Sequence, residues 1–183
     1  VCTRRGDLGS STHQAFGLFF LISMQNAVLR RPGGENSRVP NFLYVDEFPD
    51  FICKATEAIF TMYRKYRVGT IISAQNLAQL ETPKSRENYR NTILSNCANK
   101  VFTGNAVIDE LEWWVSEFGQ HREWTYKVDF DTEKTQYGSK YGDAKWAYVN
   151  YFTPGKLQTM LTDKLCAFKV KDIRKKLLIV LGL

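Results

Sequence analysis

Two adjacent carboxylates, Asp46 and Glu47, directly follow a short apolar run at residues 42–45, and Pro49 prevents that run from continuing as a strand. An apolar run without polar alternation predicts a strand that is buried on both faces, as in a parallel sheet. Ligands bind at the carboxyl edge of such sheets, where one acid can hold Mg²⁺ and a second can activate the attacking water in phosphoryl transfer. Asp46 would then be the metal ligand and Glu47 the catalytic residue. Acids in this position also serve as turn formers or helix N-caps, so the pair by itself leaves both interpretations open.

A nucleotide site of this type also needs a phosphate cradle. Its usual form is the glycine-rich motif G-x-x-x-x-G-K-[ST], in which backbone N–H groups and the lysine hold the β and γ phosphates. The 183 residues contain no such motif: the glycines at 33–34 follow a predicted helix, and the segment 6–12 lacks the lysine. The chain is therefore either the C-terminal piece of a larger motor or not a working ATPase.

Two further polar features lie near the acidic pair in the predicted sheet. Gln75 ends the next strand, at residues 68–74, and its amide would share the edge with the acids, where it could sense a γ-phosphate or position water. It could equally be a turn residue. Arg64, with Lys65 and Arg67, closes the intervening helix, where the helix dipole favours cations. The functional alternative is an arginine finger that reaches into a neighbouring subunit's site.

The elements that position these residues alternate between helix and strand. The predicted order is a turn at 6–11, a helix from an N-cap at Ser11 or Thr12 to about Arg31, strand 42–45, helix 54–66, strand 68–74, helix 87–96, strand 100–103 and helix 107–118. Residues 1–3 could close an earlier strand. This alternation predicts a mostly parallel sheet with helices on both faces.

One face of the first long helix should pack against this sheet, because apolar residues recur on it at three- and four-residue spacing. The predicted contact residues are Phe16, Phe19, Phe20, Ser23, Met24, Ala27 and Val28.

The remainder of the chain favours β-structure. Residues 123–130 and 144–152 alternate with period two and predict a long-looped hairpin, Thr153-Pro154 predicts the start of a short helix, and strands follow at 165–170 and 176–181. We therefore expect an α/β core at 1–119 and a β-rich extension of hairpin and strands at 120–183. The length suits one well-packed domain.

Composition and the start of the chain give further information about the class of protein. The net charge of +6 suits contact with polyanions, and Cys2, Cys53, Cys97 and Cys166 form no metal or disulfide pattern. The longest apolar stretch, at 15–24, is about ten residues, whereas a bilayer span needs about 20. Because the chain starts at Val1 without a methionine or signal peptide, we expect a soluble piece cut from a longer protein.

Trp113, Trp114 and Trp124 invite a second hypothesis, stacking on nucleic-acid bases. Leu111, Trp114 and Phe118 recur at helical spacing, however, which favours a place in the core for that group.

Taken together and in order, four segments resemble the C-terminal half of the motor domain of type IV coupling proteins, the TraG/TraD-like ATPases of conjugation. They are Tyr44-Val-Asp-Glu-Phe-Pro49, Tyr63-Arg-Lys-Tyr-Arg67, Ile71-Ile-Ser-Ala-Gln75-Asn-Leu-Ala-Gln79-Leu80 and Asn91-Thr-Ile-Leu-Ser-Asn96-Cys-Ala-Asn-Lys100. The resemblance covers nearly the whole chain and is weakest between Gln120 and Tyr151.

The resemblance implies a partial RecA-like P-loop NTPase fold that forms a homo-hexamer at the cytoplasmic face of the bacterial inner membrane. Such a motor uses ATP and Mg²⁺ to move single-stranded DNA or protein–DNA substrates from the relaxosome and its relaxase to the proteins of a type IV secretion channel. Asp46 and Glu47 match the Walker B acids, with Asp46 on the metal and nucleotide. Gln75 matches the sensor glutamine, and Arg64 matches the arginine finger, with Lys65 and Arg67 as competitors.

In that family the phosphate cradle, the membrane anchor and an all-α domain lie in sequence that precedes or interrupts this segment. We therefore predict that the isolated chain neither binds ATP tightly nor hydrolyses it. The alternative is a non-catalytic RecA-like module that docks relaxosome or secretion-channel proteins.

Overall fold

The computed structural model describes residues 5–81, 89–125, 145–170 and 177–180. They fall into two compact units, Val1–Ala98 and Asn99–Leu183, which are described separately below. The predicted division into 1–119 and 120–183 stays a prediction. The predicted strand at 1–3, the whole predicted hairpin loop, and residues 126–130 and 144 of the two predicted hairpin strands lie outside the described residues.

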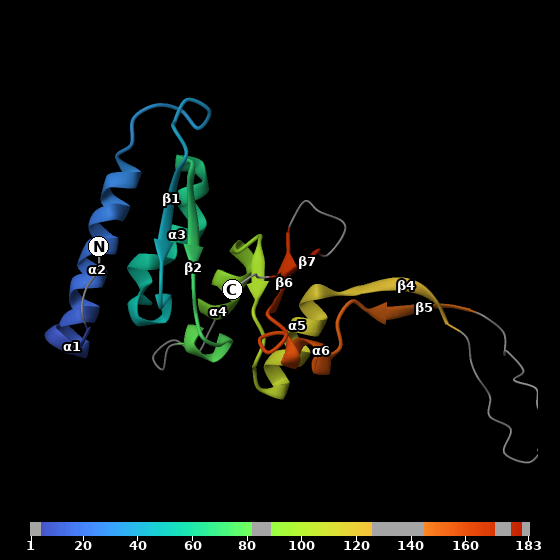
Figure 1. The fold of residues 1–183 in the computed structure, drawn as a ribbon. Coiled ribbons are helices and arrows are strands. Elements are labelled where there is room, and N and C mark those ends of the chain that lie inside the picture. The colour runs from blue at the N-terminus through green and yellow to red at the C-terminus, as the bar shows by residue number, and fades with distance from the viewer. Residues whose placement is uncertain (1–4, 82–88, 126–144, 171–176, 181–183) are drawn as a thin grey trace, which may run out of the picture. The chain divides into compact units, whose positions relative to one another are not determined.

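Helices dominate the first unit (Figure 1). Its elements in chain order are α1 (Arg5–Leu8), α2 (Ser10–Leu29), β1 (Asn41–Val45), η1 (Phe48–Phe51), η2 (Lys54–Thr56), α3 (Glu57–Met62), η3 (Tyr63–Tyr66), β2 (Val68–Ile72), η4 (Leu77–Leu80) and α4 (Tyr89–Asn96). The η elements are short 3₁₀ helices. The predicted helix at 54–66 is thus present as the continuous series η2, α3 and η3.

The start and the packing face of α2 differ from the prediction. Gly9, with φ of 74°, precedes the helix and separates it from α1, so neither Ser11 nor Thr12 is the cap. Of the predicted contact residues, Val28 is buried and Phe20 and Met24 are half-buried, whereas the others, Phe16, Phe19, Ser23 and Ala27, are exposed. Leu21, which was not predicted, is buried. Periodicity identified the face only in part, because apolar side chains surround this part of the helix and no single stripe stands out.

The two strands of the first unit form one parallel pair, as predicted. The register runs from Asn41 opposite Val68 to Val45 opposite Ile72. The carboxyl ends of both strands therefore lie at the same edge. Among the described residues of this unit, β1 and β2 have no further strand partner.

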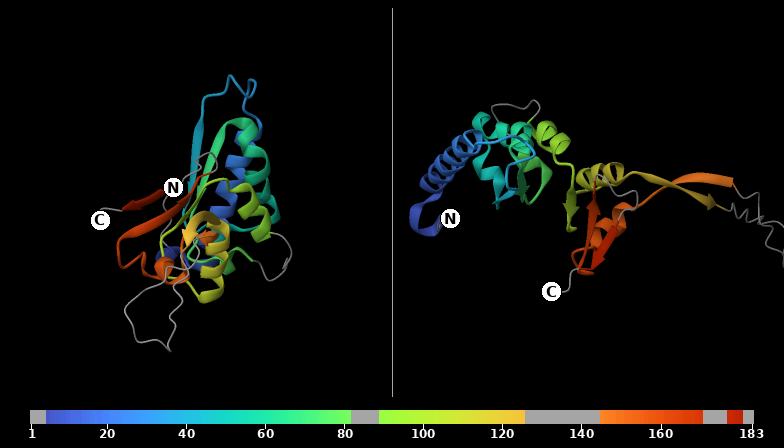
Figure 2. Two further views of the ribbon diagram at one scale, coloured as in Figure 1. Left: turned by 90° about the vertical axis from the view of Figure 1, so that its right-hand side faces the viewer. Right: turned by 90° about the horizontal axis from the view of Figure 1, so that it is seen from above.

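One face of this pair is open, which corrects the prediction of a strand buried on both faces with helices over each. Val45 and Val68 point to the covered face and are buried, whereas Phe42 and Tyr44 are 62% and 73% exposed. Seen from above in Figure 2, α2, α3 and α4 lie on one side of the strands. Within the described residues, no helix packs over the Phe42 and Tyr44 face. The sequence predicted burial on both faces because the exposed face of the strand is apolar as well.

A buried threonine ties the helices of the first unit together. The Thr56 hydroxyl is fully buried, accepts the Cys53 N–H at 3.1 Å and lies 3.0 Å from the Tyr89 hydroxyl. Tyr89 in turn donates to the Cys53 carbonyl at 2.6 Å. These bonds join η2, which leads directly into α3, to α4, and burial raises the pKa of Tyr89.

The described residues of the second unit form two antiparallel sheets and two helices (Figure 1). Its elements are β3 (Lys100–Phe102), α5 (Ile108–Phe118), β4 (Gln120–Thr125), β5 (Lys145–Asn150), α6 (Pro154–Thr159), β6 (Leu165–Lys169) and β7 (Leu177–Val180). β6 lies between β3 and β7, and β4 pairs with β5.

The pairing of β3 contradicts the expected mostly parallel sheet. Strand–helix alternation predicts the type of each element but not its partner. β3 pairs antiparallel with β6, which returns to it after the hairpin and α6. In the described residues, the sole parallel pair is β1 with β2.

The core of the second unit forms around α5, as its spacing predicted. Leu111, Trp114 and Phe118 are 3%, 6% and 1% exposed. Trp114 also stacks on Phe118, with ring centroids 5.6 Å apart, and Phe118 meets Phe152 edge-on at 5.0 Å. These aromatic contacts fix α5 against the start of α6. The Thr153 side chain caps α6 by accepting the Lys156 N–H, as predicted.

In the described part of the chain, no helix combines the length and hydropathy that crossing a bilayer requires.

Candidate functional site

The carboxyl edge of the β1–β2 pair brings together residues that are distant in sequence. Beyond the last strand pair, the Ser73 N–H donates to the Val45 carbonyl at 3.1 Å, and the Phe48 N–H donates to the Ser73 carbonyl at 3.1 Å. The ladder therefore continues past β1, and Asp46 is positioned beside Ser73. Parallel pairing fixes this neighbourhood, because the residue after one strand must lie beside the residue after the other.

Ser73 is the central hydrogen-bonding residue at this edge. Its hydroxyl donates to Asp46 Oδ1 at 2.5 Å and accepts the Glu47 N–H at 3.0 Å. The Glu47 N–H also lies 3.0 Å from Asp46 Oδ1. Ser73 thus fixes the orientation of the Asp46 carboxylate. The sequence predictions missed this role, although Ser73 lies within the predicted strand 68–74, two residues before Gln75.

The backbone at Glu47 is unusual. Its φ and ψ of 47° and 45° place it in the left-handed region, which non-glycine residues seldom adopt. Such a conformation costs about 1 to 3 kcal/mol and tends to occur where function requires a particular side-chain direction. It turns the chain sharply from β1 into η1 and leaves Glu47 exposed at the edge of the sheet.

Gln75 lies at the same edge, in the turn after β2. Its N–H donates to the Gln79 side-chain carbonyl at 3.2 Å. The Asn76 side chain accepts the Gln79 N–H at 3.0 Å and so caps η4. Side-chain hydrogen bonds of Gln79 and Asn76 therefore hold the turn, while Gln75 remains exposed.

These residues line one cleft with a volume of about 510 Å³. The lining residues are Asp46, Glu47, Pro49, Asp50, Ser73, Ala74, Gln75 and Gln79. Three predicted site residues, Asp46, Glu47 and Gln75, are thus brought together. Carboxylate, hydroxyl and amide oxygens face a common space that is open to solvent.

Arg64 is not part of this cleft. It lies in η3, which precedes β2, and so occupies the opposite end of the strand pair. Of its competitors, Arg67 donates from its guanidinium to the Asn36 carbonyl at 3.1 Å. Arg64 and Lys65 are exposed and no side-chain partner is seen for either among the described residues. Arg64 as the arginine finger, with Lys65 and Arg67 as its competitors, stays a prediction.

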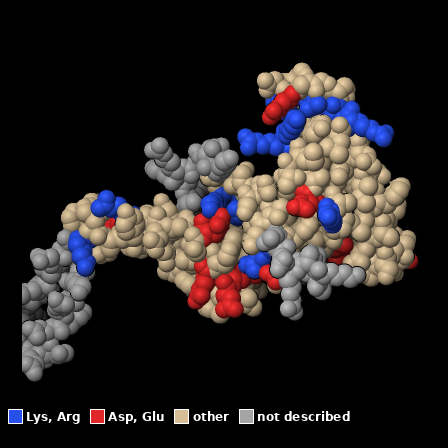
Figure 3. Space-filling view, turned by 180° about the vertical axis from the view of Figure 1, so that it is seen from behind, with Lys and Arg blue, Asp and Glu red and all other residues tan. Residues whose placement is uncertain are grey.

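Other arginines build the same end of the unit. Arg31 donates to the Tyr66 carbonyl at 2.8 Å, and Arg38 donates to the Lys65 carbonyl at 3.0 Å while its guanidinium lies 4.6 Å from the Tyr66 ring centroid. Figure 3 shows basic side chains gathered at the end of this unit that carries the loop between α2 and β1.

The chemistry of the cleft fits a magnesium–nucleotide complex better than a metal held by protein alone. The described residues contain no group of three or more His, Cys, Asp and Glu side chains that could hold a metal ion. Mg²⁺, however, commonly takes one or two protein oxygens and completes its shell with phosphates and water. Asp46 and Ser73 offer oxygens of that type.

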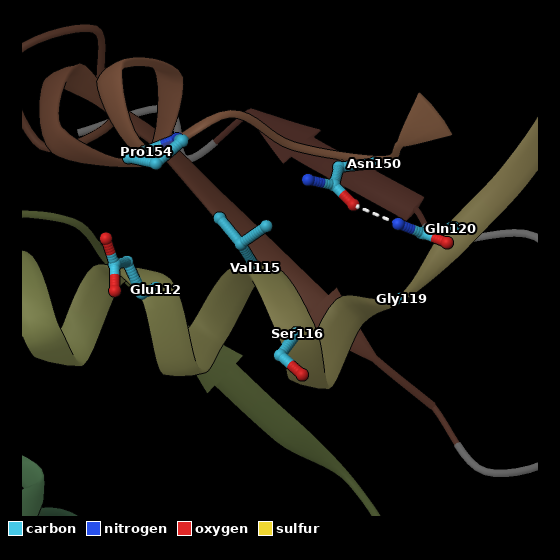
Figure 4. Close-up of a pocket in the computed structure, with 7 residues that line it drawn as sticks. All are labelled: Glu112, Val115, Ser116, Gly119, Gln120, Asn150 and Pro154. Atoms are coloured by element: carbon cyan, nitrogen blue, oxygen red, sulfur yellow. Dashed lines mark hydrogen bonds between the residues drawn. The ribbon is translucent and has the colours of Figure 1, made fainter. Parts of the chain in front are cut away.

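The second unit contains a separate cleft of about 590 Å³ between α5, the base of the hairpin and the start of α6. Figure 4 shows Glu112, Val115 and Ser116 on α5, with the Gln120 amide donating to Asn150 at 2.9 Å. None of the predicted site residues lines this cleft.

Comparison with known proteins identifies the family. Residues 40–154, more than half of the chain, match the family model described as the TraM recognition site of TraD and TraG. No protein with a curated function matches the chain.

Solved structures show the same fold. The chain is similar to an unbound form of the bacterial conjugative coupling protein TrwB that begins after its first 70 residues, with 15% identity and a TM-score of 0.71 over 89% of this chain. It also matches TrwB bound to a non-hydrolysable GTP analogue (14% identity, TM-score 0.67) and to a non-hydrolysable ATP analogue (16%, 0.66), each over 89% of this chain.

The chain spans 36% of the unbound TrwB chain and 35% of each of the two nucleotide-bound chains. The four segments that carry the resemblance, at 44–49, 63–67, 71–80 and 91–100, all fall in the matched family region. The chain belongs to the TraD and TraG family and is a fragment of a type IV coupling protein.

Proposed function

We propose that this chain is the C-terminal half of a RecA-like motor domain, in an ATPase that powers conjugative transfer of single-stranded DNA or a protein–DNA substrate. The observation that supports this proposal most directly is the cleft at the carboxyl edge of β1 and β2, which is lined by Asp46, Glu47, Ser73 and Gln75. Family membership supports the link to conjugation. The nucleotide analogues bound to TrwB support a nucleotide as the ligand.

Each residue at the edge has a role in this proposal. Asp46, oriented by Ser73, would hold the magnesium of MgATP, and the ion supplies charge neutralisation for the phosphates. Glu47 accepts a proton from the attacking water, and Gln75 positions that water or senses the γ-phosphate. The unusual backbone at Glu47 supports a fixed direction for its carboxylate.

The position of Arg64 supports action between subunits. It lies across the strand pair from the cleft, so it cannot serve the acids of its own chain. In a ring, the η3 end of one subunit can face the cleft of its neighbour, as an arginine finger in trans requires. We propose a homo-hexamer at the cytoplasmic face of the inner membrane on this basis and on family grounds.

The site in this chain is half of a nucleotide site. The sequence holds no phosphate cradle, and the Phe42 and Tyr44 face of the strands is open. We therefore propose that the cradle comes from another part of the full-length protein, and that the chain alone neither binds ATP tightly nor turns it over.

Plasmid transfer between cells tests this function. A Glu47→Gln variant of the full-length protein should lower transfer frequency by orders of magnitude at normal protein level, because the catalytic carboxylate is lost. Glu35→Gln is the matched control: it makes the same change on an exposed loop, away from the cleft. Wild-type transfer by the Glu47→Gln strain would overturn the proposal.

A second candidate function is a docking module that binds relaxosome proteins, including the relaxase, or channel proteins without catalysis. The family description, a recognition site for TraM, favours it. Purified chain would then retain relaxosome protein in a pull-down without nucleotide. If transfer also survives Glu47→Gln, the docking function would replace the motor function.

A further inference from the structure

The β4–β5 hairpin presents two chemically different faces. Cross-strand pairing places Arg122 opposite Tyr148 and Trp124 opposite Trp146, so these four side chains share one face. We call this set the aromatic face. Glu123, between Arg122 and Trp124, points to the other face, as does Lys145.

The rings of the aromatic face are exposed to solvent. Trp124, Trp146 and Tyr148 are 48%, 50% and 70% exposed, in contrast to the buried Trp114 of the same unit. Figures 1 and 2 show the hairpin extending away from α5 and α6. Large exposed rings gathered on one side of a strand pair mark a binding surface more often than chance placement.

The rings already contact one another and a cation. The Trp124 and Trp146 centroids are 4.6 Å apart, and the Arg122 guanidinium lies 5.5 Å from the Trp146 ring and 5.9 Å from the Tyr148 ring. A guanidinium over aromatic rings is oriented for both cation–π contact and phosphate binding.

Charge on the two faces favours an anionic partner for the aromatic face. Among the described residues of the hairpin, this face carries Arg122 and no carboxylate. The acid of that described part, Glu123, lies on the opposite face and pairs with His121 at 3.4 Å. The chain as a whole has a net charge of +6. Rings next to a cation, on a face whose described residues include no acid, suit a ligand that has both flat apolar faces and negative charge.

Polar groups continue this face at the base of the hairpin. Gln120 and Asn150 form the next cross-strand pair and join through their amides at 2.9 Å. Both line the cleft of Figure 4. Each amide has further donor and acceptor capacity that can meet the edge of a base. The surface thus changes from aromatic rings to hydrogen-bonding groups between one cross-strand pair and the next on this face, a distance of about 6.8 Å along the strands.

We propose that the aromatic face binds single-stranded DNA, with bases stacked on Trp124, Trp146 and Tyr148 and a phosphate held by Arg122. Stacking on rings tolerates any sequence, which suits a transfer machine that must carry whatever DNA it is given. The choice of DNA rests on the proposed function, but the binding itself needs neither ATP nor the Asp46 cleft.

The test is direct binding of a fluorescein-labelled dT₁₂ oligonucleotide to the 183-residue chain, followed by anisotropy without nucleotide. A Trp124→Ala/Trp146→Ala variant should weaken binding, because each stacked base contributes about 1 to 3 kcal/mol, or about 5- to 150-fold in Kd. Trp124→Phe/Trp146→Phe retains both rings and should keep most of the affinity, provided circular dichroism shows both variants folded.

Two matched controls separate the aromatic face from general charge and general exposure. Lys145→Ala removes a cation from the opposite face of the same hairpin and should weaken binding less than Arg122→Ala. Tyr44→Ala removes a ring of similar exposure, 73%, from the other unit and should leave binding unchanged. Unchanged affinity in the double alanine variant, or no binding by the wild-type chain, would overturn the proposal and favour a protein partner.

The proposed motor function and the proposed DNA binding can be tested independently of each other. In the full-length protein, the double alanine variant should lose plasmid transfer but keep basal ATP turnover, whereas Glu47→Gln should lose turnover but keep dT₁₂ binding. If Glu47→Gln left turnover intact while the alanine variant lost DNA affinity, the DNA-binding inference would stand without the motor function.

Discussion

Substitution of Ser73 by alanine isolates the residue that orients the Asp46 carboxylate. The Ser73 hydroxyl donates to Asp46 Oδ1 and accepts the Glu47 N–H. Alanine removes both bonds and keeps the strand backbone, whose own hydrogen bonds to Val45 and Phe48 do not use the side chain. The acids remain, but the metal-binding carboxylate can rotate.

The expected size follows from these two bonds. A hydrogen bond to a charged group contributes about 1.5 to 3 kcal/mol when it is shielded from water. Ser73 and Asp46 are both exposed in this structure, so water can replace part of that interaction. We therefore expect a loss of about 1 kcal/mol, below that range, or about 5-fold in the affinity for MgATP.

The assay is steady-state ATP hydrolysis by the full-length protein over a range of Mg²⁺ and ATP concentrations. Ser73→Ala should raise the KM for MgATP about 5-fold, with a smaller change in kcat. Ser95→Ala, at an exposed position on α4, is the control and should leave both constants unchanged. An unchanged KM together with an unchanged Mg²⁺ requirement would refute the role of Ser73.

Two further predictions concern the stability of the second unit. Glu117 lies 2.9 Å from Lys100 and 2.7 Å from Lys169; burial alone would raise its pKa, but hydrogen bonds from both lysines outweigh burial and lower it. A carboxylate whose pKa is lowered by folding stabilises the fold at pH values above its ordinary pKa, and this stabilisation is lost as the pH falls through the pKa of the folded state. Glu117→Gln should therefore lower the free energy of unfolding by about 1 to 3 kcal/mol at pH 7, and progressively less below about pH 4. Urea unfolding over a range of pH measures this. Gly104 has φ of 101°, and a Cβ there would lie 2.6 Å from the Leu161 backbone nitrogen, so Gly104→Ala should lower the thermal midpoint by several degrees, and an unchanged midpoint would contradict this packing.

Local sequence signals predicted most elements and the acidic edge. The strand before Asp46, the helical spacing around Trp114 and the Thr153-Pro154 start of α6 each depend on a few neighbouring residues, and the structure contains all three, although one face of that strand is exposed. Asp46, Glu47 and Gln75 could be placed together because two adjacent parallel strands must end at one edge.

Features that depend on distant contacts could not be predicted in this way. The antiparallel pairing of β3 with β6 depends on where the chain returns after α6. The exposure of Phe19 on α2 depends on which side of an apolar helix finds a partner, and Gly17 lets that helix approach Phe51 closely. Ser73 was missed because its partner, Asp46, is 27 residues away in sequence.

The central claim is that Glu47 performs chemistry and does not merely shape the edge of the sheet. The most direct measurement compares ATP turnover with binding of a non-hydrolysable ATP analogue in the purified full-length Glu47→Gln variant. Turnover should fall at least about 100-fold, within the range for a lost general base, and analogue affinity should stay within about 2-fold of wild type. Undiminished turnover, or turnover and affinity lost in equal measure, would contradict the claim.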